Sequence, residues 1–325
     1  MRDNARREKS AMACDVAGRL LLRAGLGLFA LLVASASVSD AHAATAQTVF
    51  ASPEKAVDGL VSAVRGGSTD RLLRILGPGS RKLVSSGDAV ADAQARKKLI
   101  TEYDATNTIE KKDDARAILV VGKDEWPFPF PIVKEGTVWR FDSRAGAEEI
   151  IDRRIGANEL AAIEVCRAYV AAQREYAEKD RNRDGILEYA RKFLSSPGKE
   201  DGLYWPTKAG EDQSPLGPLI VQARAAGYGQ GKVRGRTPYH GYYYKILLGQ
   251  GPAARDGAYD YVVEGRMIAG FALVAYPAQY GSSGIMTFIV NQDGIVYQKN
   301  LGADTAEVAN EMEVLDPDPT WTTTP

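Results

Sequence analysis

The chain has 325 residues, of which 45% are hydrophobic and 26% are charged. Its 41 basic and 42 acidic side chains nearly cancel, so the sequence lacks the electrostatic footprint of a nucleic-acid-binding protein. Only two cysteines and two histidines are present, which argues against zinc sites and structural disulfides.

The N-terminus is typical of an export signal. Basic residues up to Arg23 overlap an apolar run from Leu20 to Ala34, and Ala41-His42-Ala43 offers the small residues that signal peptidase accepts. This pattern predicts that residues 1–43 are a cleaved signal peptide and that the protein is periplasmic or secreted in a bacterium. A retained anchor is the alternative, but the run is short of the roughly 20 apolar residues that span a membrane. No later segment is long and apolar enough, so we expect no transmembrane segment after cleavage.

Cleavage changes which reactive residues remain. It removes Cys14 and His42, leaving Cys166 and His240 as the only cysteine and histidine. Cys166 lies at an apolar position of a predicted helix, which favours a buried, unreactive thiol. Whether translation starts at Met1 or Met12 stays open.

Residues 50–155 are predicted to form an N-terminal α+β domain. Helices are expected from Ser52-Pro53-Glu54 onward, from Asp70 to Leu76 and from Asp88 to about Tyr103. Three antiparallel strands follow, at residues 117–121, 132–133 and 138–141. This order of elements is similar to that of the cystatin-like and nuclear-transport-factor-like α+β folds.

Residues 156–321 are predicted to form a C-terminal α+β domain. A long helix from Ala145 to about Lys179 joins the two domains, with a break possible near Gly156. An antiparallel sheet is expected after it, and Asn291-Gln292-Asp293-Gly294 is predicted to be a hairpin turn. The strands of this sheet are expected at residues 242–248, 259–263, 267–276, 284–290 and 295–299. The expected fold class is therefore α+β.

The loop after the long helix carries half of a calcium-binding motif. Asp180, Asn182 and Asp184, followed by Gly185, place oxygen ligands at the first, third and fifth positions of such a loop. Arg191 stands where a bidentate glutamate closes the site, and only Glu188 offers a partial substitute. The alternative is a metal-free turn, in which Asp and Asn are favoured for their own hydrogen bonds. No other cofactor is expected.

His240 is the one candidate general base. It precedes a strand within a tyrosine-rich segment, and Asp201 is the candidate carboxylate that would orient it. This pair defines the hydrolase hypothesis, in which the protein acts on an envelope polymer. The competing interpretation is a structural histidine that packs on tyrosine rings.

Aromatic residues offer a second kind of site. Tyr204, Trp205, Tyr239 and Tyr242, together with Arg266, are the candidate ligand-binding residues. Aromatic rings with charged residues at their rim suit a glycan or a peptide. The same rings also serve as core residues, and this alternative stays open.

Several segments of the C-terminal half resemble one bacterial family, the domain-of-unknown-function family numbered 2950. They are Asp184–Ala190, Ser195–Trp205, Ser214–Pro218, Tyr239–Tyr244, Gly265–Leu273 and Thr287–Gly294. The resemblance covers residues 50–321 and implies an exported envelope protein, but it brings no activity and no catalytic residue. A fainter similarity joins the C-terminal half to pilin-like and pseudopilin sheets, although the assembly helix of those proteins is missing here.

These observations favour a non-catalytic binding or assembly module of the bacterial envelope, with an envelope protein or a glycan as its partner. The alternative is the hydrolase with His240 as general base. The sequence leaves the ligand, the oligomeric state and the placement at the inner or outer membrane open.

Overall fold

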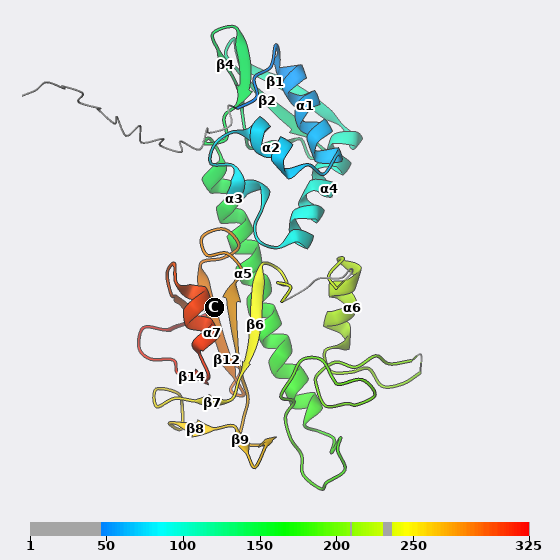
Figure 1. The fold of residues 1–325 in the computed structure, drawn as a ribbon, viewed down its shortest axis with the longest axis vertical. Coiled ribbons are helices and arrows are strands. Elements are labelled where there is room, and N and C mark those ends of the chain that lie inside the picture. Colours follow the sequence, from blue (N-terminus) through cyan, green and yellow to red (C-terminus); the bar gives the residue numbers. More distant parts are fainter. Residues whose placement is uncertain (1–46, 209, 230–235, 325) are drawn as a thin grey trace, which may run out of the picture. The chain divides into compact units, whose positions relative to one another are not determined.

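The computed structural model describes residues 47–208, 210–229 and 236–324. Residues Ala44–Pro325 form one compact unit, in which the buried hydrophobic residues gather in two separate cores. We call residues 47–146 the N-terminal lobe and residues 177–324 the C-terminal lobe. The predicted signal peptide, with Cys14 and His42, lies outside the described residues. The mixture of helices and antiparallel sheets confirms the predicted α+β class (Figure 1).

Four helices open the N-terminal lobe: α1 (Pro53–Arg65), α2 (Thr69–Leu76), α3 (Arg81–Val84) and α4 (Ala89–Ala105). Ser52 caps α1, since its side chain accepts a hydrogen bond from the Lys55 N–H at 3.3 Å. The apolar stripe of α1 is buried against the sheet and the neighbouring helices. By contrast, α4 has no fully buried residue at all.

A five-stranded antiparallel sheet completes this lobe. Its strands are β1 (Asn107–Asp113), β2 (Arg116–Val121), β3 (Trp126–Pro127), β4 (Ile132–Glu135) and β5 (Val138–Phe141). Their order is β1-β2-β4-β5, with β3 pairing to β2. The sequence analysis missed β1, because only Ile109 in it is even partly buried and its polar sequence carries no hydrophobic alternation.

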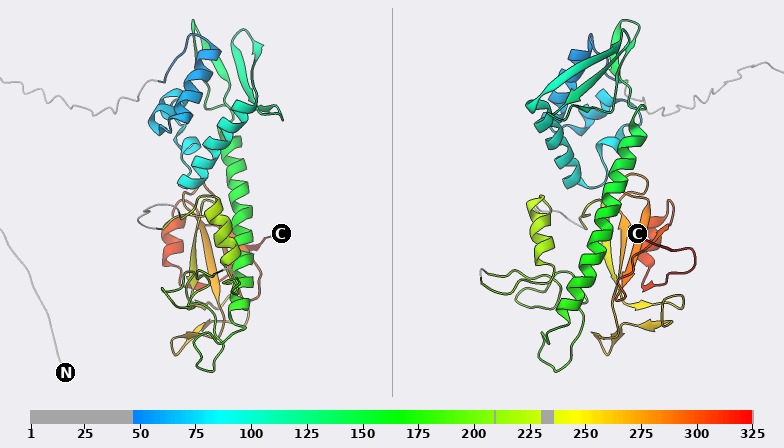
Figure 2. Two further views of the ribbon diagram at one scale, coloured as in Figure 1. Left: turned by 90° about the vertical axis from the view of Figure 1, so that its right-hand side faces the viewer. Right: turned by 180° about the vertical axis from the view of Figure 1, so that it is seen from behind.

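The long helix α5 (Ala147–Tyr176) runs through both lobes without interruption (Figures 1 and 2). Its 30 residues continue past Gly156, so the possible break there is not found. Ile150 packs against the N-terminal core, whereas Tyr169 and Tyr176 belong to the C-terminal core. Cys166 is fully buried, and burial raises the pKa of its thiol to about 12, which leaves it protonated and unreactive.

The main sheet of the C-terminal lobe lies between two helices. Its strands β6 (Tyr242–Leu247), β11 (Ala272–Pro277), β12 (Met286–Asn291), β13 (Tyr297–Asn300) and β15 (Thr322–Thr323) are ordered β15-β13-β12-β11-β6. Helix α5 covers one face and α7 (Thr305–Glu311) the other (Figure 2). Every residue of β11 is therefore buried. The predicted hairpin joins β12 to β13, with Gly294 at a φ of 80°.

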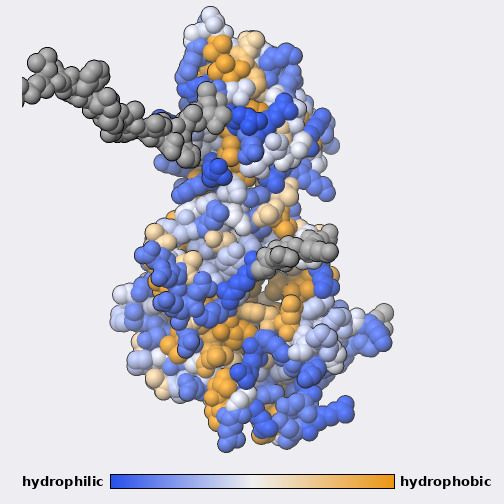
Figure 3. Space-filling view, viewed as in Figure 1, coloured by the Kyte–Doolittle hydropathy of each residue, from blue (hydrophilic) through white to orange (hydrophobic). Residues whose placement is uncertain are grey.

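Short elements complete the C-terminal lobe. They are α6 (Gly217–Ala225), β7 (Gly249–Gln250), β8 (Tyr259–Asp260), β9 (Val262–Val263), β10 (Arg266–Met267) and β14 (Val314–Leu315). The expected strands at 259–263 and 267–276 are thus each divided between shorter strands. Hydrophilic side chains cover most of the face in Figure 3, including the loops that follow α5. None of the helices in the described ranges is long and apolar enough to cross a membrane.

Candidate functional site

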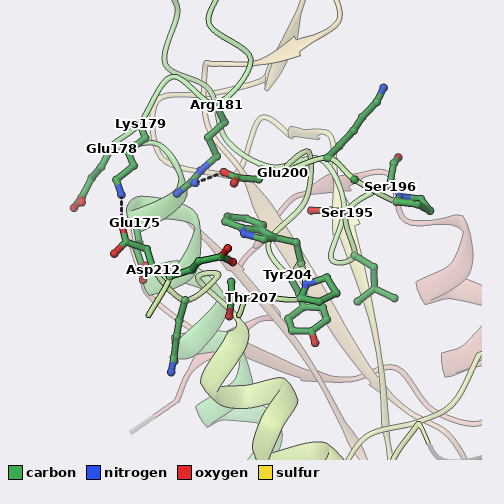
Figure 4. Close-up of a pocket in the computed structure, with 18 of the residues that line it drawn as sticks. Glu175, Glu178, Lys179, Arg181, Ser195, Ser196, Glu200, Tyr204, Thr207 and Asp212 are labelled. Carbon is green, nitrogen blue, oxygen red and sulfur yellow. Dashed lines mark hydrogen bonds and ion pairs between the residues drawn. The ribbon is translucent and has the colours of Figure 1, made fainter. Parts of the chain in front are cut away.

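A wide pocket lies at the C-terminal end of α5, between that helix and the loops that follow it. Its volume is about 1230 Å³, which is above the roughly 300–1,000 Å³ of most small-molecule sites. Figure 4 shows its side chains converging from α5 and from the loop that carries Ser195 and Tyr204. Its lining includes the aromatic side chains Tyr204 and Trp205 and the charged side chains Lys179, Arg181, Glu200 and Arg224.

Arg181 organises the aromatic wall of this pocket. Its guanidinium carbon lies 4.8 Å from the ring centroid of Trp205 and 4.9 Å from that of Tyr176. Its Nη1 is 3.0 Å from Glu200 Oε2, and only 11% of its side chain is exposed. Cation–π contacts and an ion pair together restrict both the arginine and the indole. Trp205 is therefore held in place before any ligand arrives.

Backbone pairing positions Tyr204. Its N–H donates to the Phe193 carbonyl and its own carbonyl accepts from the Ser195 N–H, both at 2.8 Å. The guanidinium of Arg224 lies 5.2 Å from the Tyr204 ring centroid. A second arginine–aromatic contact thus involves the residue next to Trp205, and Tyr204 is fixed by a β-bridge to Leu194.

The rim of the pocket mixes both signs of charge. Lys179 Nζ pairs with Asp212 Oδ2 at 2.9 Å, and hydrogen bonding to that lysine lowers the pKa of the Asp212 carboxyl. Glu175, Glu178 and Glu211 add carboxylates to the lining. The pocket therefore offers charged hydrogen-bond donors and acceptors around aromatic rings.

Asp201 lies outside this lining, although its neighbour Glu200 is part of it. Lys192 Nζ is 2.7 Å from Asp201 Oδ2, and the Ser196 N–H donates to Oδ1 at 2.7 Å. Burial acts to raise the pKa of the Asp201 carboxyl, but these hydrogen bonds prevail and lower it to about 2. Asp201 is thus an ionised, fully engaged carboxylate that holds its own loop together.

His240 is half-buried and packs beside Tyr239, with the two ring centroids 4.2 Å apart. Its backbone has a left-handed φ of 50°, and its N–H donates to Tyr228 Oη at 3.3 Å. Burial lowers the pKa of the imidazole, whereas the charge of Asp88 acts to raise it. Within the described ranges the imidazole makes no hydrogen bond to a carboxylate or hydroxyl, and no contact joins it to Asp201.

The other candidate aromatic residues do not share the pocket with Tyr204 and Trp205. Tyr242 is fully buried, and its hydroxyl donates to the Met286 carbonyl at 2.9 Å. Tyr239 is half-buried against Tyr228, at 4.9 Å between ring centroids. Tyr242 therefore belongs to the core, and the four aromatic candidates do not form one site.

The calcium-like loop is closed by hydrogen bonds of its own. The Asp180 carboxylate accepts from the backbone N–H groups of residues 183 and 185, both at 2.7 Å. Asn182 Nδ2 donates to Asp184 Oδ2 at 2.9 Å and to Glu188 Oε1 at 3.1 Å. Arg266, a predicted ligand-binding residue, instead pairs with Asp184 at 2.7 Å. No group of three or more His, Cys, Asp or Glu side chains able to hold a metal occurs in the part of the chain that the structure describes.

Sequence reasoning missed Arg181 and Arg224. Arg181 stands between Asp180 and Asn182, at a position of the calcium-like motif that provides no ligand, so the motif predicts no role for it. Arg224 lies on α6, a helix for which the sequence carries no strong signal. Their only sequence signal was the general alternation of basic and acidic residues after α5.

The fold and the pocket together define a mixed α+β protein with a preorganised site of aromatic rings and paired charges. The chain belongs to the family described as "Protein of unknown function (DUF2950)", whose model matches residues 47–324. This match confirms the family resemblance seen in the C-terminal motifs. No curated protein and no solved structure matches the chain. The cystatin-like, nuclear-transport-factor-like and pilin-like similarities stay predictions.

Proposed function

We propose that this protein is an exported, non-catalytic module of the bacterial envelope that binds a glycan in the pocket of Arg181, Tyr204 and Trp205. The observation that carries this proposal is the Trp205 indole held by the Arg181–Glu200 ion pair on the wall of a pocket of about 1230 Å³. Sugar rings present apolar C–H faces and polar hydroxyl edges. A fixed aromatic ring suits the former, and paired carboxylates and guanidinium groups suit the latter.

Binding is favoured over hydrolysis because His240 and Asp201, the two candidate catalytic residues, do not contact each other. Asp201 is engaged with Lys192 and Ser196, and the His240 imidazole packs on Tyr239. A general base needs a proton-bearing group within hydrogen-bond reach. The pocket instead supplies the rigid aromatic and polar contacts that a binding site uses.

The binding experiment compares Trp205→Ala with the wild-type chain, lacking residues 1–43, by co-sedimentation with purified bacterial peptidoglycan. We expect Trp205→Ala to weaken binding at least tenfold, which corresponds to about 1.4 kcal/mol. Trp126→Ala is the matched control, because Trp126 is 40% exposed and lies outside this pocket. Equal binding by both variants, or release of soluble sugar by the wild-type protein, would contradict the proposal.

The export step has its own experiment. The mature protein purified from bacterial cells is expected to have the mass of a chain that begins at Ala44, since cleavage follows Ala43. Changing Ala43 to Arg should block processing, whereas Thr45→Arg, beyond the cleavage bond, is the matched control. A mature protein that retains residues 1–43 would contradict this part of the proposal.

A further inference from the structure

A second cavity, of about 920 Å³, lies within the N-terminal lobe. It is bounded by α1, α2, α4, the sheet and the first turns of α5. Its interior is apolar and comes from Leu60, Val64, Leu72, Leu76, Val121, Phe128 and Phe130, all of which are buried. This volume lies within the range of small-molecule pockets.

The composition of α4 explains why the cavity stays open. The residues that this helix turns toward the cavity include Ala91, Ala95, Leu99 and Glu102, which lie along one helical face. The two alanines are too small to fill the space above the sheet. Because α4 has no fully buried residue, it covers the cavity without entering it.

The charged lining residues of the cavity are mainly basic. Arg96 is half-buried, and Lys98 and Arg116 are exposed. Within the described ranges, none of these three side chains makes a hydrogen bond, ion pair or cation–π contact. Arg154, by contrast, is bound to the carbonyls of residues 82 and 83, both at 2.7 Å.

Three acidic residues also line the cavity. Asp92 is occupied, because it accepts hydrogen bonds from the Ser86 N–H at 3.1 Å and from its hydroxyl at 2.8 Å. Glu102 and Asp124 are the other two. With Arg153, the lining carries five basic side chains and three acidic ones, so its charge favours an anion.

We propose that the N-terminal lobe binds a free long-chain carboxylate, with its alkyl chain in the apolar cavity and its carboxylate at Arg96, Lys98 and Arg116. The two halves of the cavity fit the two halves of such a ligand: buried apolar side chains take the chain, and unpaired cations take the head group. This site is separate from the pocket at Trp205, and the inference does not depend on glycan binding.

The experiment is a calorimetric titration of the chain lacking residues 1–43 with decanoate, dodecanoate and tetradecanoate, each below its micelle-forming concentration. Affinity is expected to rise roughly fourfold with each added methylene group until the cavity is full. Dodecyltrimethylammonium carries the same chain with the opposite charge and is expected to bind at least tenfold more weakly than dodecanoate. Affinity independent of chain length, or equal affinity for the cation, would overturn the proposal.

Paired variants on α4 locate the site. Ala95→Trp fills the cavity and should abolish dodecanoate binding, whereas Ala93→Trp, on the same helix but outside the lining, should leave it unchanged. Lys98→Gln should weaken binding several-fold, whereas Lys97→Gln should not. The lysine pair keeps the inference testable if Ala95→Trp fails to fold. Equal effects of Lys97→Gln and Lys98→Gln would place the ligand elsewhere.

Discussion

The hydroxyl of Tyr228 donates a hydrogen bond to Asp88 Oδ2 at 2.9 Å, across 140 residues of sequence. The same oxygen accepts the Gly241 N–H, also at 2.9 Å. The other oxygen, Oδ1, caps α4 by accepting from the N–H groups of Val90 and Ala91. A carboxylate that is only 1% exposed thus joins the start of a helix in one lobe to two loop residues of the other.

Replacing Asp88 with Asn is expected to destabilise the protein by about 2–3 kcal/mol, because charged hydrogen bonds are lost in a buried site. An amide oxygen can still cap α4, but its NH₂ group would then face the donors of Tyr228 and Gly241. The free energy of unfolding in urea measures the effect. Asp70→Asn is the control, since Asp70 is an exposed residue of α2. A loss below about 0.5 kcal/mol for Asp88→Asn, the range of ordinary surface changes, would contradict this role.

The buried environment of His240 predicts a dependence of stability on mildly acidic pH. Burial lowers the pKa of His240 in the folded protein, so the unfolded chain takes up its proton first as the pH falls. The free energy of unfolding should therefore decrease as the pH falls below about 6.5, the ordinary histidine value. NMR titration of the folded protein measures the pKa of His240 without overlap, because His240 is the only histidine after residue 43. Urea unfolding at a series of pH values measures the free energy. A titration midpoint above the ordinary value would reverse the sign and refute the prediction.

Asp201 predicts a second pH effect, at stronger acidity. Its pKa of about 2 lies below its ordinary value of 3.8, so its hydrogen bonds stabilise the fold above pH 3.8. That contribution should be lost as the pH falls from 3.8 toward 2. At pH 6, Asp201→Asn should unfold at a lower urea concentration than the wild type. Near pH 2, the difference between the two urea midpoints should become smaller. A constant difference across this range would show that Asp201 contributes by shape rather than by charge.

The loop from Asp180 to Glu188 is expected to keep its form without calcium. Arg266 already supplies a positive charge to Asp184, and backbone N–H groups occupy Asp180. Thermal melts in 1 mM calcium and in excess chelator should therefore give the same midpoint. A site with a dissociation constant of about 10 μM would instead add about 2.7 kcal/mol. Such a shift, absent from Asp180→Asn, would establish the calcium interpretation.

Elements with strong local signals were predictable from the sequence. The Ser52 cap, the stripe of α1 and the hairpin at residues 291–294 each depend on residues close in sequence, and all three are present. Strand β1 and helix α6 escaped prediction because their burial is slight. Their conformation is decided by the strand or loops they pack against, which no local pattern reveals.

The candidate site shows the same division more sharply. Composition alone left one histidine and one cysteine after residue 43, and local motifs identified Tyr204 and Trp205. Only the tertiary structure brought Arg181 between Tyr176 and Trp205, separated His240 from Asp201 and buried Tyr242.

The sequence by itself thus determined the family, the α+β class and the chemical groups on hand, because these follow from residue identity and short-range periodicity. The tertiary structure decided which groups meet. Contacts between distant residues depend on how whole elements pack, and packing is a property of the complete core.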